Sequence, residues 1–236
     1  MGSTGGSQQP PPDEGTGQAG SRGRRDFLSR GVERFSLFSD AVVAIAITLL
    51  AIELPLPSGN SASALWTSVR HEDGHYIAFL ISFTVIAASW NDHFDLFRCI
   101  KKVDGRLRTL NAGWLLMIVL NPFATRLLTS RGNEDLYAHA LRFGFYALLQ
   151  VLDTLLMLAM VRHMNSRRLA PDTPPEVVTG LVHQEFAQLL GFSLSIPLFF
   201  VTGYAWILWV AIPVLIRVRG RLPLFSYRGP QPSGGG

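Results

Sequence analysis

Residues 34–54 read RFSLFSDAVVAIAITLLAIEL, and this stretch decides the fold. Beyond Asp40 its only charged residue is Glu53. The run Phe35–Leu54 matches the roughly 20 apolar residues that a helix needs to cross a membrane. The chain is therefore predicted to be an integral membrane protein.

The composition supports the same conclusion along the whole chain. Of its residues 48% are hydrophobic and 16% are charged, against about 25% charged in soluble domains. Residues 1–21 and 223–236 are rich in Gly, Ser, Pro and Gln, so both are predicted to be disordered tails. Between them, residues 22–222 form one predicted membrane domain. The single cysteine, Cys99, excludes an internal disulfide.

Six stretches are long and apolar enough to be proposed as membrane helices. The resulting fold class is all-α, with six transmembrane helices per chain. The fifth is short and begins with polar residues, so its assignment depends on the charge pattern described next. The predicted spans are Phe35–Leu54, His75–Phe97, Leu107–Leu128, Leu136–Val161, Glu185–Phe200 and Thr202–Val218.

The number of arginines and lysines alternates between high and low from one joint between predicted spans to the next. They gather before the first span, at 98–108, at 162–168 and at 217–228, and are sparse in the joints between. Because positive residues favour the cytoplasmic side, this pattern predicts six spans with both termini in the cytoplasm of a multi-pass cell-membrane protein. The arginines flank apolar runs and form no basic helix, which argues against nucleic acid as a partner. Ala62–Arg70 is equally compatible with a short amphipathic helix at the outer interface and with an ordinary loop.

Charged groups inside membrane helices are costly and point to function. Asp40 lies about 9 Å deeper than Arg34 at 1.5 Å per residue, and His93 is expected at a similar depth in the second span. A buried polar network of the three is one interpretation. The alternatives are a snorkelling arginine, a carboxylate near a helix start and an interfacial histidine.

The first span has two distinct faces. At about 100° per residue, Asp40 and Ile45 point roughly 140° apart. One face carries Leu37, Asp40, Ala44, Ile47 and Ala51, and the other carries Phe38, Val42, Ile45, Leu49 and Ile52. If the Asp40 face packs inside the subunit, the Ile45 face lies against lipid or a symmetry axis, and periodicity does not choose between them.

The segment 34–40 reads Arg-x-x-x-Phe-Ser-Asp and opens an apolar helix that contains Thr48. It resembles the signature of the transmembrane protein 175 family, potassium channels of endosomes, lysosomes and prokaryotes. Trp90, His93 and the Asn-Pro-Phe-Ala-Thr segment at 121–125 are also similar to that family. The resemblance covers the first three predicted spans. The single repeat resembles the prokaryotic form, in which four chains surround a pore.

The resemblance implies a potassium-favouring cation channel in which the first helix of each chain of a homotetramer lines the pore. Potassium ions, membrane lipid and further copies of the chain are the implied partners, and no cofactor is implied. The implied roles are a hydrophobic constriction, an ion preference, a polar network behind the pore helix and an outer mouth. The matching residues are Ile45, Leu49 and Ile52 for the constriction, Thr48 for the preference, Arg34, Ser39, Asp40 and His93 for the network, and Glu53 for the mouth.

Two other functions compete with a channel. A secondary transporter would use Asp40 and Asp153 as proton relays, although the six predicted helices show no internal repeat or paired broken helices. An intramembrane enzyme is disfavoured because the sequence has no metal-spaced His and Glu pairs, no Gly-x-Ser-x-Gly motif and no catalytic partner for its cysteine. The expectation is therefore a protein that is not an enzyme and holds no metal.

Overall fold

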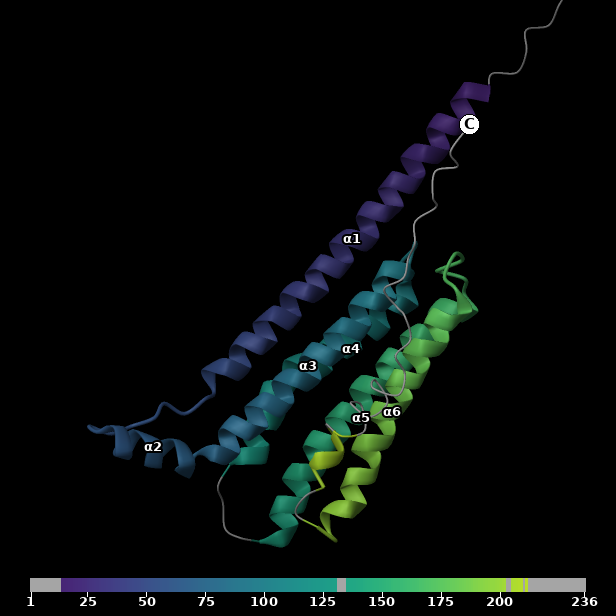
Figure 1. The fold of residues 1–236 in the computed structure, drawn as a ribbon. Helices are drawn as coiled ribbons and strands as arrows, with labels where there is room; N and C mark the ends of the chain where they lie inside the picture. Colours follow the sequence, from purple (N-terminus) through teal and green to yellow (C-terminus); the bar gives the residue numbers. More distant parts are fainter. Residues whose placement is uncertain (1–13, 131–134, 203–204, 210, 212–236) are drawn as a thin grey trace, which may run out of the picture.

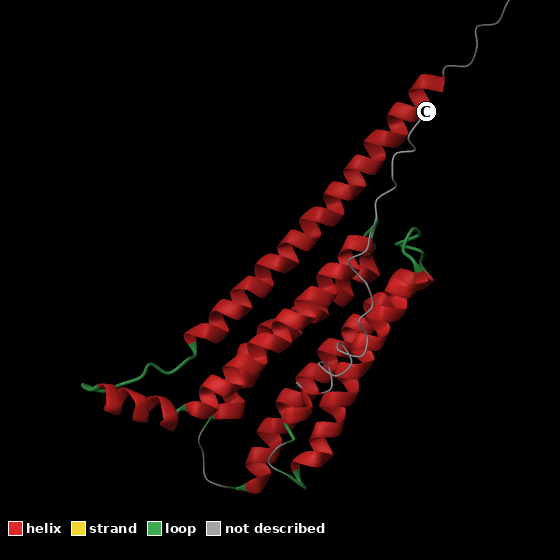
Figure 2. Cartoon of the chain, in the orientation of Figure 1, coloured by secondary structure: helices red, strands yellow, loops and turns green. Residues whose placement is uncertain are grey.

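The computed structural model describes residues 14–130, 135–202, 205–209 and 211, with side chains from residue 30 onward. This part of the chain consists of helices joined by loops (Figure 2). In order, the helices are α1 (Glu14–Ile52), α2 (Ala62–His71), α3 (Asp73–Cys99), α4 (Gly105–Thr129), α5 (Leu136–Ser166) and α6 (Pro175–Phe199).

The long helices form a bundle with α4 near its middle. Helix α4 contacts α1, α3 and α5, and α6 packs on α5. Figure 1 shows α1 along one side of the bundle, α5 and α6 on the other, and α3 and α4 between them. The largest apolar core lies among α1, α3, α4 and α5 and includes the fully buried side chains of Leu50, Ile86 and Trp114. Helix α1 is thus held on one side only.

Short polar residues set where several helices begin. Asp104 precedes α4 and accepts a hydrogen bond from the Leu107 amide at 2.8 Å. Ser61 caps α2 in the same way, accepting from the Ala64 amide at 3.2 Å. Each cap satisfies a backbone N–H that has no partner inside its helix, which stabilises the helix start by about 1 kcal/mol.

The prediction of six membrane-spanning helices is wrong. In the described residues four helices are long and apolar enough to cross a membrane, namely Arg30–Ile52, Asp73–Cys99, Gly105–Thr129 and Leu136–Ser166. They overlap the first four predicted spans. The prediction that both termini share the cytoplasmic side depended on the count of six and is withdrawn with it.

The error has a physical cause in the fifth predicted span. Helix α6 begins at Pro175, ten residues before the predicted start at Glu185, and carries Gln184, Glu185 and Gln188 along its middle. These side chains lower its apolar content below that of the four spans. The alternation of basic joints reports orientation and does not measure apolarity, so it gave the fifth segment too much weight. Most of the sixth, Thr202–Val218, lies outside the described residues.

Two further segments refine the sequence expectations. Helix α1 begins at Glu14, inside the segment 1–21 for which a disordered tail was expected. Composition gave no sign of this because glycine disfavours helices, and the segment contains several. The stretch at 62–70 forms helix α2, in which Leu65 and Trp66 are exposed and no residue is buried. Figure 1 shows α2 turned away from the bundle beyond the end of α1.

Candidate functional site

Helix α1 packs on the bundle through one narrow face. Ser39, Val43, Ala46 and Leu50 are 0%, 2%, 0% and 2% exposed, respectively. Steps of four, three and four residues place them on one side of a helix. The small side chain of Ala46 suits close helix packing in a membrane. This face anchors α1 to α3 and α4.

The packing face predicted from the sequence is displaced from this one. Leu37, Ala44 and Ala51 were placed on the inward face together with Asp40, and all three are exposed. The prediction took the charged Asp40 as the centre of the buried side. Asp40 instead lies at its edge, about 60° around the helix from Val43 and about 80° from Leu50.

The opposite side of α1 is an exposed apolar stripe. Ile45 is 61% exposed, Leu49 45% and Ile52 72%. Thr48 is also exposed, and its hydroxyl donates to the Ala44 carbonyl at 2.8 Å. Because the hydroxyl hydrogen is used within the helix, the oxygen lone pairs of Thr48 face outward as acceptors. We call this side, with Ile45, Thr48, Leu49 and Ile52, the outer stripe.

Behind α1, a chain of polar groups connects three helices. Nε2 of His93 is 2.7 Å from Asn111 Oδ1. Asn111 Nδ2 in turn donates a hydrogen bond to Ser39 Oγ at 3.0 Å. Ser39 in turn donates to the Phe35 carbonyl at 3.2 Å. The amide oxygen of Asn111 can only accept, so Nε2 carries the proton in this bond. Nδ1 is buried and has no hydrogen-bond partner in the described chain, so a second proton there would be unpaired and the neutral ring is favoured. The bonds run in one direction, from α3 through α4 to the backbone of α1.

His93 is held in place by aromatic rings as well. Its ring stacks on Trp114 with centroids 4.2 Å apart and on Phe97 at 4.3 Å, and the histidine is fully buried. A ring clamped between two others has little rotational freedom, so the hydrogen-bonding direction of Nε2 is fixed. The structure thus brings together Ser39 and His93, two of the four predicted network residues, through Asn111.

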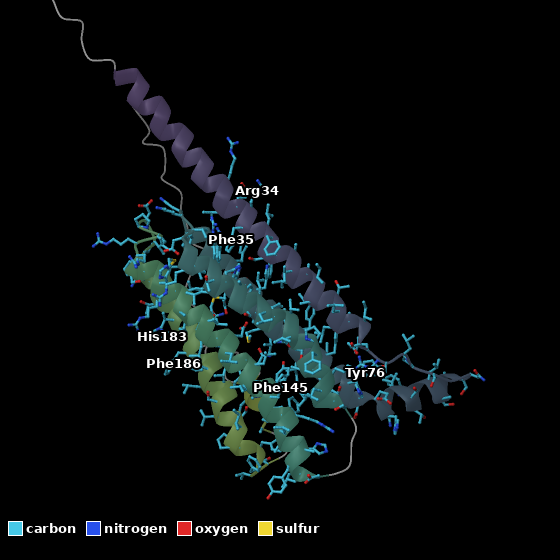
Figure 3. The ribbon with its side chains drawn as sticks, turned by 180° about the vertical axis from the view of Figure 1, so that it is seen from behind. Arg34, Phe35, Tyr76, Phe145, His183 and Phe186 are labelled. Atoms are coloured by element: carbon cyan, nitrogen blue, oxygen red, sulfur yellow. The ribbon has the colours of Figure 1, made fainter. Side chains whose placement is uncertain are left out.

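Asp40 and Arg34 are arranged differently. Asp40 accepts a hydrogen bond from the indole of Trp90 at 2.9 Å. Arg34 is exposed and makes no ion pair with Asp40 in the described chain. Arg34 and Phe35 lie on α1 close to one end of the bundle, while Tyr76 lies near the other end (Figure 3). There Tyr76 donates to the Pro55 carbonyl at 2.8 Å, which ties the residues after α1 to α3.

Asn111 is the residue that sequence reasoning missed in this chain of bonds. An uncharged amide in an apolar helix has no partner that its spacing identifies. The available signal was an amide side chain inside a predicted span, since polar side chains inside membrane helices form hydrogen bonds to neighbouring helices.

Glu53 lies at the end of α1 and is paired. Its carboxylate is 3.2 Å from Arg126 Nη1 of α4, and the two side chains are 39% and 70% exposed. The pair ties the last turn of α1 to α4 and neutralises much of the carboxylate charge at the predicted outer mouth.

A second polar region lies deeper in the bundle and contains three buried carboxyl groups. Asp92, Asp153 and Glu185, from α3, α5 and α6, are at most 4% exposed. Both oxygens of Asp92 accept from side-chain amides, those of Gln184 and Gln188. The carboxyl of Glu185 lies beside that of Asp92. Because ionised carboxylates only accept, a hydrogen bond between the two requires that one of them holds a proton.

The two polar regions meet at Ser89 of α3. The indole of Trp114 donates to Ser89 Oγ at 3.0 Å, and Ser89 donates to Asp153 Oδ2 at 2.8 Å. Trp114 also stacks on His93, so it touches both regions. Within the described residues no group of three or more His, Cys, Asp or Glu side chains has a geometry that fits a metal ion.

Comparison with known proteins connects this site to a family. Residues 34–122 match the family described as the endosomal/lysosomal potassium channel TMEM175. The matched segment contains the membrane-spanning part of α1, the whole of α3 and most of α4. It therefore includes the outer stripe and the His93, Asn111 and Ser39 chain.

Individual relatives agree with the family match. The chain is 29% identical over 197 residues to a potassium channel of Streptomyces collinus, covering 81% of this chain and 89% of the relative. It is 37% identical over 92 residues to a potassium channel of a Chryseobacterium species, covering 39% of this chain and 46% of that relative. The chain thus spans less than half of the second relative.

The fold is also similar to a solved structure. The crystal structure of a lysosomal potassium-selective channel TMEM175 homologue from Chamaesiphon minutus superposes with a TM-score of 0.65 at 23% identity, covering 80% of this chain and 96% of that chain. Together these findings confirm the resemblance predicted from the motif at 34–40 and support a multi-pass membrane protein. The matched family is one of ion channels, not of enzymes.

Proposed function

We propose that this chain, a member of the TMEM175 family of prokaryotic type, forms a potassium channel in the cell membrane. The two bacterial relatives and the similar structure all carry the name of potassium channels, which supports the class of function. The pore is lined by the outer stripe of α1, contributed by four copies of the chain. Potassium ions, lipid and the other subunits are its partners.

One observation carries the assignment of α1 to the pore. Its membrane span is anchored by a narrow face, while the outer stripe leaves Ile45, Leu49 and Ile52 between 45% and 72% exposed. In an isolated chain, such an exposed apolar stripe is compatible both with contact to lipid and with a position at the symmetry axis of an oligomer. A symmetry axis also explains why the rotation of α1 is fixed. The hydrogen-bonded chain from His93 to Ser39 fixes that rotation, whereas contact with lipid does not require a fixed rotation.

The outer stripe then determines how ions pass. Rings of Ile45, Leu49 and Ile52 side chains offer an ion no oxygen to replace its hydration shell, so a narrow ring resists conduction by dewetting. Thr48, between them, presents oxygen lone pairs and sets the preference among cations. Opening requires a modest separation of the α1 helices that admits water.

The polar groups around α1 hold it in place. The Ser39, Asp40 and His93 side chains fix the packed face. Arg34 lies exposed on α1 close to one end of the bundle, where a neighbouring subunit is accessible to it. Glu53 at the outer mouth acts as a paired acid with Arg126, so its contribution to cation attraction depends on that pair opening.

The test replaces one exposed isoleucine and two controls with asparagine. Ile45→Asn is expected to raise conductance or open probability several-fold, because it places polar groups in the ring. Leu116→Asn, at a side chain of α4 that is 53% exposed, is expected to leave current unchanged, since it lies away from the pore. Val43→Asn, at 2% exposure, is expected to reduce folded protein. Single-channel current at equal surface expression decides, and an effect of Leu116→Asn that equals that of Ile45→Asn would refute the assignment.

A secondary transporter remains the competing function because Asp92, Asp153 and Glu185 are buried together. Such groups serve as proton relays in transporters. Purified protein in a planar bilayer separates the two. Single-channel steps carried by potassium support the channel, and slow saturable flux coupled to protons supports the transporter.

A further inference from the structure

We propose that the groove lined by Arg30, Arg34 and Arg108 is a binding site for the phosphate of an anionic phospholipid in the cytoplasmic leaflet. The groove has a volume of about 450 Å³ and lies between α1 and the beginning of α4. Its remaining lining is Gly31, Val32, Phe35 and Val103. The groove shares only Phe35 with the polar chain behind α1, whose last bond ends on the Phe35 carbonyl.

Its position is at the level of lipid headgroups. Arg34 directly precedes the apolar run of α1 that begins at Phe35, and Arg108 lies in the first turn of another candidate span, Gly105–Thr129. The ends of membrane spans lie where apolar chains give way to headgroups. Basic residues also gather at this end of the bundle, in the joint at 98–108 and near 162–168. By the positive-inside rule this end faces the cytoplasm, whose leaflet carries anionic lipid.

The charges in the groove favour an anion. Arg30 and Arg34 are one helical turn apart, so their like charges repel each other. Among the described residues, all three arginines are exposed, and no ion pair to a carboxylate is formed by Arg30, Arg34 or Arg108. The neighbouring acid on α1, Glu33, is exposed and forms no ion pair with them either. A phosphate group would relieve the repulsion, and guanidinium matches it with paired hydrogen bonds.

The apolar lining distinguishes a lipid from a free anion. Val32 is buried, and Phe35 and Val103 are half-buried beside it, so the floor of the groove is apolar. Phe35 is itself fixed by Phe97, with ring centroids 5.7 Å apart. A soluble phosphate gains nothing from such a floor, whereas the glycerol and upper acyl carbons of a phospholipid bury against it. The groove is thus suited to an amphipathic anion.

The experiment measures lipid retained by the full chain. The purified protein is equilibrated with mixed micelles of equal phosphatidylglycerol and phosphatidylcholine, and native mass spectrometry gives the ratio of the two lipids bound. The wild-type chain is expected to retain phosphatidylglycerol preferentially. Arg108→Gln and Arg30→Gln are each expected to lower that preference about fivefold. Arg162→Gln, at an exposed arginine of the same end outside the groove, is expected to leave it unchanged.

Several outcomes overturn the proposal. Equal retention of both lipids by the wild type removes the site, and an equal loss in Arg162→Gln shows diffuse surface attraction. Displacement of bound lipid by millimolar glycerol phosphate identifies a soluble-anion site instead. Arg108→Lys keeps the charge and is expected to retain most of the preference for phosphatidylglycerol. If Arg108→Gln loses the preference only because it misfolds, its thermal midpoint falls below that of the lysine variant. Because the readout is lipid, the result is independent of potassium conduction.

Discussion

Asp92 and His93 are consecutive in α3, yet they belong to two buried polar regions of different chemistry. On the side of α1, His93, Asn111 and Ser39 form a neutral chain of directed hydrogen bonds. On the side of α6, Asp92 meets Glu185 and two glutamines, and Asp153 lies nearby. The first region contains amides, rings and hydroxyls, and the second contains carboxyl groups.

The difference teaches what each region does for the fold. The neutral chain has little charge to desolvate and fixes one geometry, as positioning an adjacent helix requires. The acidic region buries groups whose ionised forms are expensive in a membrane. Hydrogen bonds from the side-chain amides of Gln184 and Gln188, together with a proton shared between Asp92 and Glu185, stabilise this region. The first therefore sets the rotation of α1, and the second holds α6 against α3.

The largest expected effect comes from the residue that touches both regions. Trp114→Ala removes the stack on His93, the hydrogen bond to Ser89 and a fully buried side chain, and is expected to cost about 3–5 kcal/mol. Thermal unfolding in detergent measures it. Trp114→Phe keeps much of the ring and is expected to lose only about 1 kcal/mol, from the missing N–H. Equal losses in the two variants would mean that the bond to Ser89 carries the effect.

A double-mutant cycle tests whether the neutral region is one chain. His93→Ala and Asn111→Ala are each expected to cost about 1–3 kcal/mol, because each leaves buried partners unpaired. Since the residues are bonded to each other, their coupling is expected to be about 0.5–3 kcal/mol.

The control for this cycle is the pair His93 and Asp40. Asp40 bonds to Trp90 and not to His93, so the coupling is expected to be smaller than that of His93 and Asn111. Stronger coupling to Asp40 would show that the carboxylate, not the amide, organises the helix.

A smaller effect is expected in the acidic region if Glu185 holds the proton. Glu185→Gln keeps a donor toward Asp92 and is expected to change the free energy of unfolding by less than about 1 kcal/mol. Glu185→Leu removes the donor and is expected to cost about 1–3 kcal/mol. Thermal midpoints of both variants decide. A glutamine variant as unstable as the leucine variant would contradict a protonated Glu185.

The smallest effect is expected at a partly exposed carboxyl, Asp104, which is paired with a buried histidine and serves as a reference for the fully buried carboxyl groups. Asp104 is 2.8 Å from His163 Nε2, and its side chain is 32% exposed. The Leu107 amide, with a smaller contribution from His163, lowers the pKa of Asp104 below its usual range. Asp104→Asn preserves the helix cap and is expected to cost less than about 1 kcal/mol.

The sign of the pH dependence follows from the lowered pKa of Asp104. The contribution of its carboxylate is fully present above the ordinary aspartate pKa of about 3.9 and disappears as the pH falls through the lower folded value. The thermal midpoints of wild type and Asp104→Asn should therefore converge only in strong acid. A difference that shrinks between neutral pH and pH 5 would contradict this assignment.

The sequence predicts the parts of this fold that depend on one helix at a time. Long apolar runs identify α1, α3, α4 and α5, because membrane length is a local property. The fifth span was overestimated because charge alternation was taken as a substitute for apolarity, and most of the sixth lies outside the described residues. The motif at 34–40 correctly indicated the similarity to the TMEM175 family, since its residues are contiguous.

Contacts between helices were harder to predict. Ser39 and His93 were expected in one network, but the Asn111 that joins them was not, because partners across helices leave no spacing in the sequence. The inward face of α1 was misplaced because a charged residue, Asp40, was taken as its centre. The meeting of Asp92 with side chains of α6 was not predicted, since hydrogen bonds between α3 and α6 form only in the folded bundle.

The hydroxyl of Ser89 has one further consequence for the two regions that it connects. It receives the indole N–H of Trp114 and gives its own proton to Asp153. An indole nitrogen donates and never accepts, so no proton passes from Ser89 to the ring. The Ser89 hydroxyl therefore links the helices mechanically but does not conduct protons to Trp114. Whatever protons the acidic region exchanges, helix α1 is isolated from them along this route.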